Sequence, residues 1–185
     1  PLRPRSLTHG VDWRNMATPA EKKEARAKGW QKPDLIGVWN DIKAKKKITG
    51  FPPGKALEYL IIRSFDIDGI KVRWPYDIAT PQKVGTVEQV DGFVHLGDRG
   101  FIVEAKDLAS PVSIETVAKL RFRLESRPPG TMGLIFSMKD YTSPAELLTQ
   151  FAMPRNIILW GRDDIDYGIS ADRMKIGLEK KIDFI

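Results

Sequence analysis

Residues 84–106 constrain the fold more than any other part of this sequence. The stretch is rich in β-branched and aromatic residues, and Gly97-Asp98-Arg99-Gly100 interrupts it. Two extended runs separated by a tight, glycine-flanked turn are typical of a β-hairpin. The sequence therefore predicts strands over residues 84–96 and 101–106 that pair in antiparallel fashion.

This hairpin brings charged side chains together. If Gly97 pairs with Gly100 across the turn, Asp91 lies opposite Lys106. Because side chains alternate along a strand, Asp91, Glu104 and Lys106 then project from one face. The Cβ atoms of direct cross-strand partners are roughly 5 Å apart and those of diagonal neighbours roughly 7–8 Å. At these separations two carboxylates can share one small cation.

The three charged residues have two interpretations. Burying two carboxylates and an ammonium is costly unless something compensates them. One interpretation is a salt-bridge cluster in which Lys106 neutralises the acids, and the other is a site that binds a cation. The acid-x-lysine pattern alone does not decide, since it recurs in Glu21-Lys22-Lys23, Asp41-Ile42-Lys43 and Glu179-Lys180-Lys181. Only Glu104-Ala105-Lys106 follows a predicted strand with an aspartate on the neighbouring one.

The remaining patterns predict an α/β domain over residues 53–170. Phe51-Pro52-Pro53-Gly54 is a stop signal, and a helix with an apolar stripe follows it. Ser110-Pro111 and Ser143-Pro144 are helix starts. The expected elements are a helix at 55–65, strands at 70–74, 84–96 and 101–106, a helix after 111, a strand at 131–138, a helix at 143–152 and a strand at 156–160. We expect a mixed central β-sheet flanked by helices, with residues 171–185 as a C-terminal tail.

Residues 1–52 are expected to form a basic helical N-terminal arm. The net charge of the chain is +6, and residues 1–50 hold twelve lysines and arginines against five acids. The arm either grips nucleic acid or is a solvated charged extension. Its apolar residues should attach it to the body of the domain; they are Trp13, Trp30, Leu35, Ile36, Val38 and Trp39.

Composition excludes several kinds of site. The chain has no cysteine and two histidines, so disulfides and a thiolate or histidine zinc cluster are excluded. A metal must be held mainly by carboxylate oxygens. No apolar run is long enough to cross a bilayer, and the first residues lack the apolar core of a signal peptide. We therefore expect a cytoplasmic protein without a membrane partner.

At this point the sequence resembles a known family. Val90-Asp91-Gly92-Phe93, followed by Ile102-Val103-Glu104-Ala105-Lys106-Asp107, is similar to the signature of the PD-(D/E)xK nucleases, in particular the restriction-endonuclease-like branch. The runs at 133–137 and 156–160 fall where that branch has its later core strands, and Glu58 falls where many members carry an acid. Val90 stands where the family name has proline. The resemblance covers about residues 54–169 and implies a restriction-endonuclease-like core.

The resemblance also implies a chemistry. Asp91, Glu104, the carbonyl of Ala105 and Glu58 would hold one or two Mg²⁺ ions, for which Mn²⁺ can substitute. Lys106 would position the attacking water or stabilise the charge on the reacting phosphate. The chain would then be a metal-dependent endonuclease, acting on DNA in restriction, phage defence or mobile-element biology. Glu58 can equally be an ordinary glutamate on a helix surface.

The remaining candidates concern the substrate and partners. Gln89 can contact the substrate, and Lys119, Arg121 and Arg123 can grip phosphates, or all four can be ordinary strand and surface residues. The expected partner is a nucleic acid, with DNA favoured and RNA left open, and a homodimer or a partner subunit is the other partner to consider. The alternative function is a catalytically inactive nucleic-acid-binding or assembly module that keeps the nuclease fold.

Overall fold

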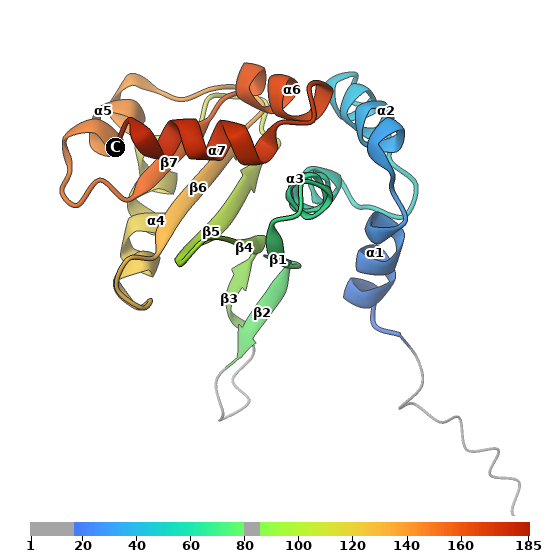
Figure 1. The fold of residues 1–185 in the computed structure, drawn as a ribbon, viewed down its shortest axis with the longest axis horizontal. Helices are drawn as coiled ribbons and strands as arrows, with labels where there is room; N and C mark the ends of the chain where they lie inside the picture. Colours follow the sequence, from blue (N-terminus) through green and yellow to red (C-terminus); the bar gives the residue numbers. More distant parts are fainter. Residues whose placement is uncertain (1–16, 80–85) are drawn as a thin grey trace, which may run out of the picture.

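The computed structural model describes residues 17–79 and 86–185. At its centre is a five-stranded sheet with the order β1-β4-β5-β6-β7 (Figure 1). Its strands are β1 (Lys71–Arg73), β4 (Gly92–Leu96), β5 (Arg99–Lys106), β6 (Met132–Ser137) and β7 (Ile157–Trp160). The neighbours among β1, β4 and β5 are antiparallel, whereas β5, β6 and β7 run parallel. The sheet is therefore mixed, as predicted.

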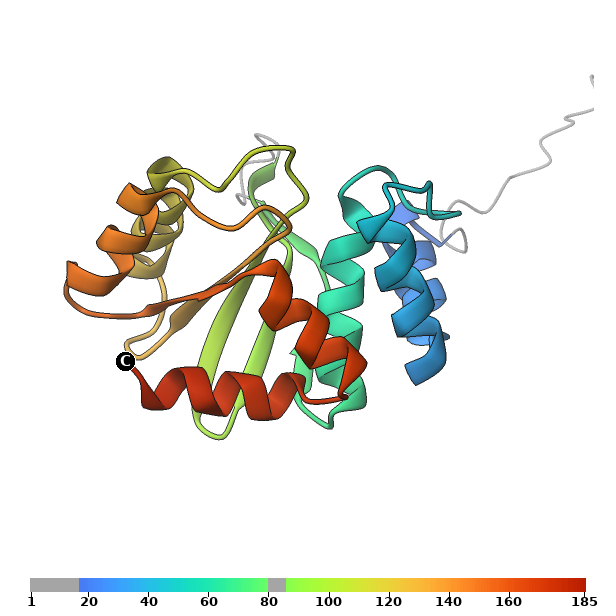
Figure 2. The ribbon, with the colours of Figure 1, turned by 90° about the horizontal axis from the view of Figure 1, so that it is seen from above.

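Helices cover both faces of the sheet, which is seen edge-on in Figure 2. The helices on one side are α3 (Lys55–Ile67), α6 (Arg162–Ser170) and α7 (Met174–Asp183), and those on the other are α4 (Ile114–Glu125) and α5 (Ser143–Phe151). Each side has its own buried apolar cluster. The predicted α/β class, with a mixed central sheet flanked by helices, is confirmed.

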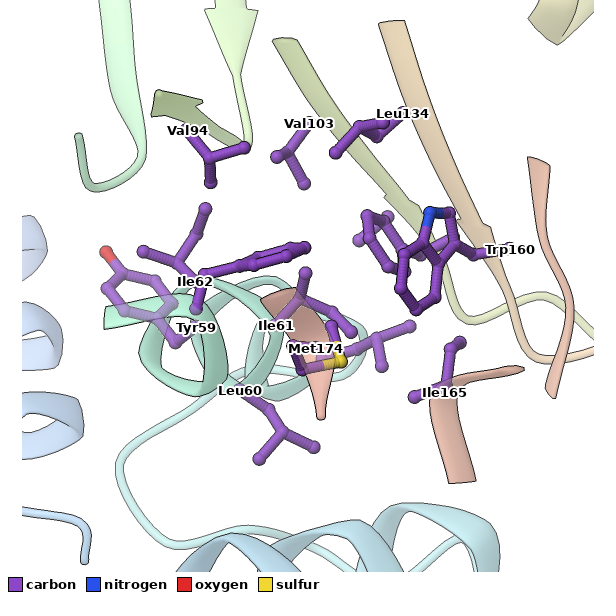
Figure 3. Packing of buried hydrophobic residues seen from close by; sticks show 14 of the residues in the cluster. Tyr59, Leu60, Ile61, Ile62, Val94, Val103, Leu134, Trp160, Ile165 and Met174 are labelled. Carbon is purple, nitrogen blue, oxygen red and sulfur yellow. The ribbon is translucent and has the colours of Figure 1, made fainter. Parts of the chain in front are cut away.

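Helix α3 is buried around most of its circumference. Its sheet-facing residues pack beneath Val94, Val103 and Leu134, as Figure 3 shows. On the side away from the sheet, α3 packs against α1 (Pro19–Lys28) and α2 (Lys32–Lys43). A helix that is apolar on most sides must be covered on most sides. This requirement explains why α1 and α2 lie against the body of the domain.

The segment predicted as an arm contributes to the core. Leu35 and Trp39 are buried, whereas Ile36 is exposed, and Trp13 lies outside the described residues. The Trp39 indole N–H donates a 2.7 Å hydrogen bond to Asp166 on α6. Several lysines of the segment form ion pairs with acids; the pairs are Lys28–Glu24, Lys32–Asp172, Lys43–Asp166, Lys45–Asp107 and Lys46–Asp41. Part of its positive charge is therefore neutralised within the molecule.

The predicted strand at 84–96 is two strands in different sheets, and residues 84 and 85 lie outside the described part. β3 (Thr86–Val90) pairs with β2 (Tyr76–Ala79) in a separate two-stranded sheet, whereas β4 belongs to the central one. The chain changes sheets at Asp91 and Gly92. Gly92 has φ +156°, and a Cβ there would lie 2.2 Å from Ile62 Cδ1 on α3. Glycine therefore permits both the backbone angle and the close approach to α3.

The predicted register of the hairpin is wrong by two residues. Leu96 pairs with Arg99 and His95 with Gly100, so the loop consists of Gly97 and Asp98. Gly97 has φ +62°, and glycine at the first central position is what a type II′ turn favours. A shift of two residues keeps the same face of each strand, so the face predicted for Glu104 and Lys106 is unaffected.

Two helices follow β7, and the second of them replaces the predicted C-terminal tail. Helix α6 begins after Gly161, whose N–H donates to the Asp164 carboxylate at 2.9 Å. The tail forms α7, in which Met174 and Leu178 are buried in the same apolar cluster as α3. Within residues 17–79 and 86–185, no helix has both the length and the apolar character needed to span a bilayer.

Candidate active site

Asp91 lies at the residue where the chain passes from β3 to β4. Its carboxylate accepts a 3.0 Å hydrogen bond from the Ala105 N–H on β5, and the residue is 8% exposed. The bond falls just beyond Gly92–Val103, the last pair of the β4–β5 ladder. Burial, followed by the nearby charge of Glu104, raises the pKa of the Asp91 carboxyl above its usual value.

The backbone of Ala105 is oriented toward the same place. Its N–H donates to Asp91 on one side of β5, whereas the carbonyl of the next residue, Lys106, accepts from Met138 N on the β6 side. Successive residues of a strand direct their polar groups to opposite sides, and the N–H and C=O of one residue share a side. The Ala105 carbonyl is therefore directed to the side on which Asp91 lies.

Glu104 is the second buried acid of the cluster, 8% exposed. It pairs with Lys106 through a 2.5 Å contact between Oε1 and Nζ. Its other oxygen accepts from Arg123 on α4, 2.8 Å away. The structure thus joins Glu104 and Lys106 as the hairpin predicted, and adds an arginine as a second cationic partner.

Glu58 is buried in the first turn of α3 and is only 7% exposed, so the helix-surface interpretation is wrong. Desolvation, followed by the charge of Asp91, raises the pKa of the Glu58 carboxyl to about 7. Lys55 donates to Glu58 at 2.7 Å, and its Nζ lies 4.0 Å from Asp91 Oδ1. Glu58 and Asp91 therefore belong to one electrostatic cluster, although they come from α3 and from the junction between the sheets.

The candidate substrate-binding residues lie in different places. Gln89 is exposed on β3, paired in register with Asp77, and no longer shares a strand with the site. Lys119 is exposed on α4, and Arg121 donates to the carbonyl oxygens of Met153 and Pro154. Arg123 contacts Glu104 itself, so this residue of the four lies directly beside the acids.

Three residues of the site were not predicted from the sequence. Lys55 contacts two of the acids, and Glu88 on β3 accepts from Arg127 at 2.6 Å. Arg123 lies between Glu88 and Glu104, with its Nε 3.7 Å from Glu88 Oε1. The position of Lys55 three residues before Glu58 was the available signal, since residues three apart are neighbours on a helix. Glu88 and Arg127 gave no comparable signal.

The donor set is compatible with a hard divalent cation. Asp91, Glu104 and the Ala105 carbonyl offer oxygen atoms, which Mg²⁺ and Mn²⁺ prefer. Within the described ranges, no group of three or more acid, histidine or cysteine side chains is arranged to hold a metal ion. A bound ion would therefore depend on two carboxylates, the backbone carbonyl and water. Mg²⁺ characteristically retains several waters, so this sparse set suits it.

A pocket of about 310 Å³ lies between α1, α3 and the β2–β3 pair, and Asp77 of β2 is the acid among its lining residues. Figure 1 shows α1 and the β2–β3 pair on either side of α3. The pocket is lined by polar and aromatic side chains from all of these elements, among them Thr18, Lys23, Lys55, Tyr59, Tyr76 and Gln89. Lys55 is therefore shared between the pocket and the acid cluster.

Three solved structures match the chain. A type III CRISPR defence DNA nuclease activated by cyclic oligoadenylate matches at 18% identity over 70% of this chain and 23% of its own, with a TM-score of 0.46. The MspJI restriction endonuclease in complex with a 27-mer oligonucleotide matches at 15% identity over 91% and 39%, with a TM-score of 0.44. The DNA modification-dependent restriction endonuclease AspBHI matches at 17% identity over 100% and 45%, with a TM-score of 0.46.

All three bear the names of nucleases. The chain spans less than half the length of each of them. No family model and no curated protein sequence matches it.

Proposed function

We propose that this chain is a metal-dependent endonuclease that hydrolyses phosphodiester bonds, with DNA as its substrate. The observation that carries the proposal is the convergence of Asp91 and the Glu104–Lys106 pair. The Asp91 carboxylate is bound to the peptide N–H between Glu104 and Lys106, so the acids and the amine come from adjoining backbone. Acids and an amine at such a position are the groups that metal-assisted phosphate hydrolysis requires.

Asp91, Glu104 and the Ala105 carbonyl would hold the cation, and Glu58 would orient it through water or bind it directly. Bound there, Mg²⁺ would polarise the scissile phosphate and lower the pKa of a coordinated water. Even with Lys55 beside them, burial raises the pKa values of Asp91 and Glu58, so their charged forms cost stability while no metal ion is bound. Buried acids that lower the stability of the folded state in this way, and whose pKa values are shifted, are typical of functional sites.

Lys106 would act on the substrate side of the cluster. Its side chain is 28% exposed and its ammonium contacts Glu104. From there it can donate to a water or to a phosphate oxygen, and it offsets the negative charge that develops at phosphorus. The Lys106–Glu104 contact also holds the carboxylate in one orientation.

The experiment is plasmid cleavage with Mg²⁺ or Mn²⁺, comparing wild type with Asp91→Ala and Lys106→Ala. We expect wild type to nick or linearise the plasmid, and each variant to lose at least ~100-fold in rate, since general acid–base and electrostatic groups contribute about 10²–10⁴ each. Binding of the same DNA by the variants should persist. If the wild-type protein leaves supercoiled, linear, branched and single-stranded DNA intact with both metals, the result contradicts the proposed nuclease activity on these substrates.

One observation favours the alternative, an inactive nucleic-acid-binding or assembly module. Each of the three buried acids has a cation within 4.0 Å: Lys55 for Glu58 and Asp91, and Lys106 and Arg123 for Glu104. This is the arrangement expected of a structural salt-bridge cluster. Calorimetric titration of Mn²⁺ separates the two functions, because a structural cluster would bind no ion.

A further inference from the structure

Lys55 occupies an unusual place at the start of α3. Its ammonium donates to Glu58 at 2.7 Å and lies 4.0 Å from Asp91. Its side chain is 25% exposed, whereas those of the two acids are 10% and 11% exposed. A single cation thus faces two buried carboxylates from the side that remains open to solvent.

The acids need a positive charge at this position. Burial disfavours the charged forms of Glu58 and Asp91, as do the charge of Asp91 beside Glu58 and that of Glu104 beside Asp91, and Lys55 is among the groups that lower both pKa values. A divalent ion held by Asp91 would supply that charge more effectively than an ammonium. Because Lys55 and the ion would compete for the same oxygens, binding of the ion would release the Lys55 ammonium.

The released Lys55 ammonium can move toward an adjoining pocket. Lys55 also lines the pocket of about 310 Å³ that Lys23, Tyr76 and Gln89 help to form. Lysine carries a compact charge on a flexible four-carbon stem with three rotatable donors, which suits movement between two anionic partners. The Lys55 side chain could reach a phosphate group of a nucleic acid bound in this pocket.

We propose that Lys55 is a resident cation of the acid cluster, which the metal displaces and which then binds a substrate phosphate in the adjoining pocket. This inference rests on the proposed function and deepens it, because it makes phosphate binding depend on metal binding. Lys55 is thereby a substrate-positioning residue, separate from the role proposed for Lys106.

The first test measures the metal alone. Mn²⁺ is titrated by calorimetry into metal-free wild type, Lys55→Met, Lys55→Arg and the control Lys180→Met, which changes an exposed lysine on α7. Removal of the competing cation should tighten Mn²⁺ binding by Lys55→Met about tenfold, or ~1.4 kcal/mol. Lys55→Arg and Lys180→Met should bind like wild type. Equal or weaker Mn²⁺ binding by Lys55→Met would overturn the displacement step.

The second test measures nucleic-acid binding. A labelled DNA duplex is titrated with saturating Ca²⁺, and again without any divalent ion, for wild type and Lys55→Met. In wild type the ion should strengthen binding by about five- to tenfold, the value of one charge-assisted phosphate contact, and in Lys55→Met this gain should be absent. An equal gain in the two proteins would overturn the phosphate step.

The outcomes distinguish this inference from the proposed function. Wild type that binds no Mn²⁺ contradicts the metal-dependent function as a whole. Wild type that binds Mn²⁺ and cleaves DNA, with Lys55→Met indistinguishable from it in both titrations, contradicts only the role of Lys55. Thermal unfolding of each metal-free variant shows whether it is folded before it is titrated.

Discussion

Asp91 serves both the fold and the proposed chemistry. Its backbone joins the two sheets. Its carboxylate accepts a hydrogen bond from the Ala105 N–H, which lies beyond the last residue pair between β4 and β5. The same carboxylate is buried beside Glu104, which raises its pKa. A residue under both demands should respond differently to loss of its charge and to loss of its hydrogen bond.

We therefore expect Asp91→Asn and Asp91→Ala to differ in stability. Asparagine keeps an oxygen that can accept from Ala105 N–H and removes a buried charge, so metal-free Asp91→Asn should unfold at a higher temperature than wild type. Alanine leaves the N–H without a partner, which costs about 1–3 kcal/mol. Thermal denaturation measures both, and equal melting temperatures for the two variants would contradict the role assigned to the hydrogen bond.

Glu58 should make the stability depend on pH. Its pKa is about 7 in the folded protein against a usual 4.5, so the folded state binds the proton more tightly than the unfolded state. The stabilising contribution of the protonated acid is full below pH 4.5 and is lost as the pH rises through 7. Metal-free wild type should therefore lose up to about 3 kcal/mol from this group over that range.

The matched variant for this prediction is Glu58→Gln, which cannot ionise. Urea denaturation at a series of pH values should show the two proteins diverging as the pH rises, with Glu58→Gln the more stable at pH 8. Parallel curves for the two proteins would mean that Glu58 ionises normally in the folded state.

At the scale of elements, arginines on α4 and just after it form ion pairs with acids of both sheets. Arg123 contacts Glu104 on β5 and faces Glu88 on β3, and Arg127 donates to the same Glu88. Breaking a buried pair leaves an uncompensated charge, at a cost of about 3–5 kcal/mol, or less where solvent reaches it. Since the Arg123 side chain is 30% exposed, we expect Arg123→Gln to lose about 1–3 kcal/mol of stability.

Lys119→Gln on the exposed side of the same helix is the control for this measurement and should change the free energy of unfolding by less than about 0.5 kcal/mol. Chemical denaturation gives both values. An Arg123→Gln variant as stable as the control would return Arg123 to the role predicted from the sequence, a surface group that grips phosphate.

The junction between β3 and β4 depends on Gly92. A Cβ at this position would meet Ile62 Cδ1 at 2.2 Å, and φ is +156°. Overpacking costs about 1–3 kcal/mol, and the backbone angle adds to it. Gly92→Ala should therefore destabilise the protein by more than Gly69→Ala, a glycine with φ +77° and nothing within 4 Å of an added Cβ. The difference in denaturation midpoints reports the contact with Ile62 together with the difference between the two backbone angles.

At the scale of the whole molecule, the sequence predicted a mixed sheet flanked by helices, and it predicted the course of the chain between the first strands less well. Apolar periodicity located α3 and the buried strands because it depends on local composition. Local composition does not mark the break at Asp91, because Gly92 is compatible with a continuous strand, and the change of sheet is seen only in the pairing of β3 with β2 and of β4 with β5. The tail was missed because α7 has a short apolar stripe that becomes informative only once Met174 and Leu178 have a partner.

The candidate site divides in the same way. Asp91, Glu104 and Lys106 were predicted because a hairpin relates sequence positions to spatial ones by simple arithmetic, and an error of two residues preserves the face. Lys55 and Glu88 come from an adjacent helix and a second sheet, whose placement relative to the hairpin no local pattern encodes. Long-range packing alone brings them to the acids.

Whether the first fifty residues bind nucleic acid is better tested by replacing single charged residues than by deleting the segment. Removing them would uncover α3, because Leu35 and Trp39 are part of its core. Lys23→Gln instead removes one charge at the edge of the pocket. If Lys23 contacts a phosphate, the slope of log affinity against log salt should fall by about one. An unchanged slope, measured by fluorescence anisotropy, would assign this lysine to another role.

Two short connections join the smaller sheet to the central sheet: Trp74 and Pro75 between β1 and β2, and Asp91 alone between β3 and β4. A tilt of the β2–β3 pair would rotate Asp91 while Glu104, anchored within β5, stays in place. We expect DNA bound against the β2–β3 pair to restrict this tilt. The carboxylates of Asp91 and Glu104 would then reach the arrangement that binds the metal ion when DNA binds. Hydrogen exchange at the Ala105 amide, which only the Asp91 carboxylate protects on that side, would slow on DNA binding if the two motions are linked.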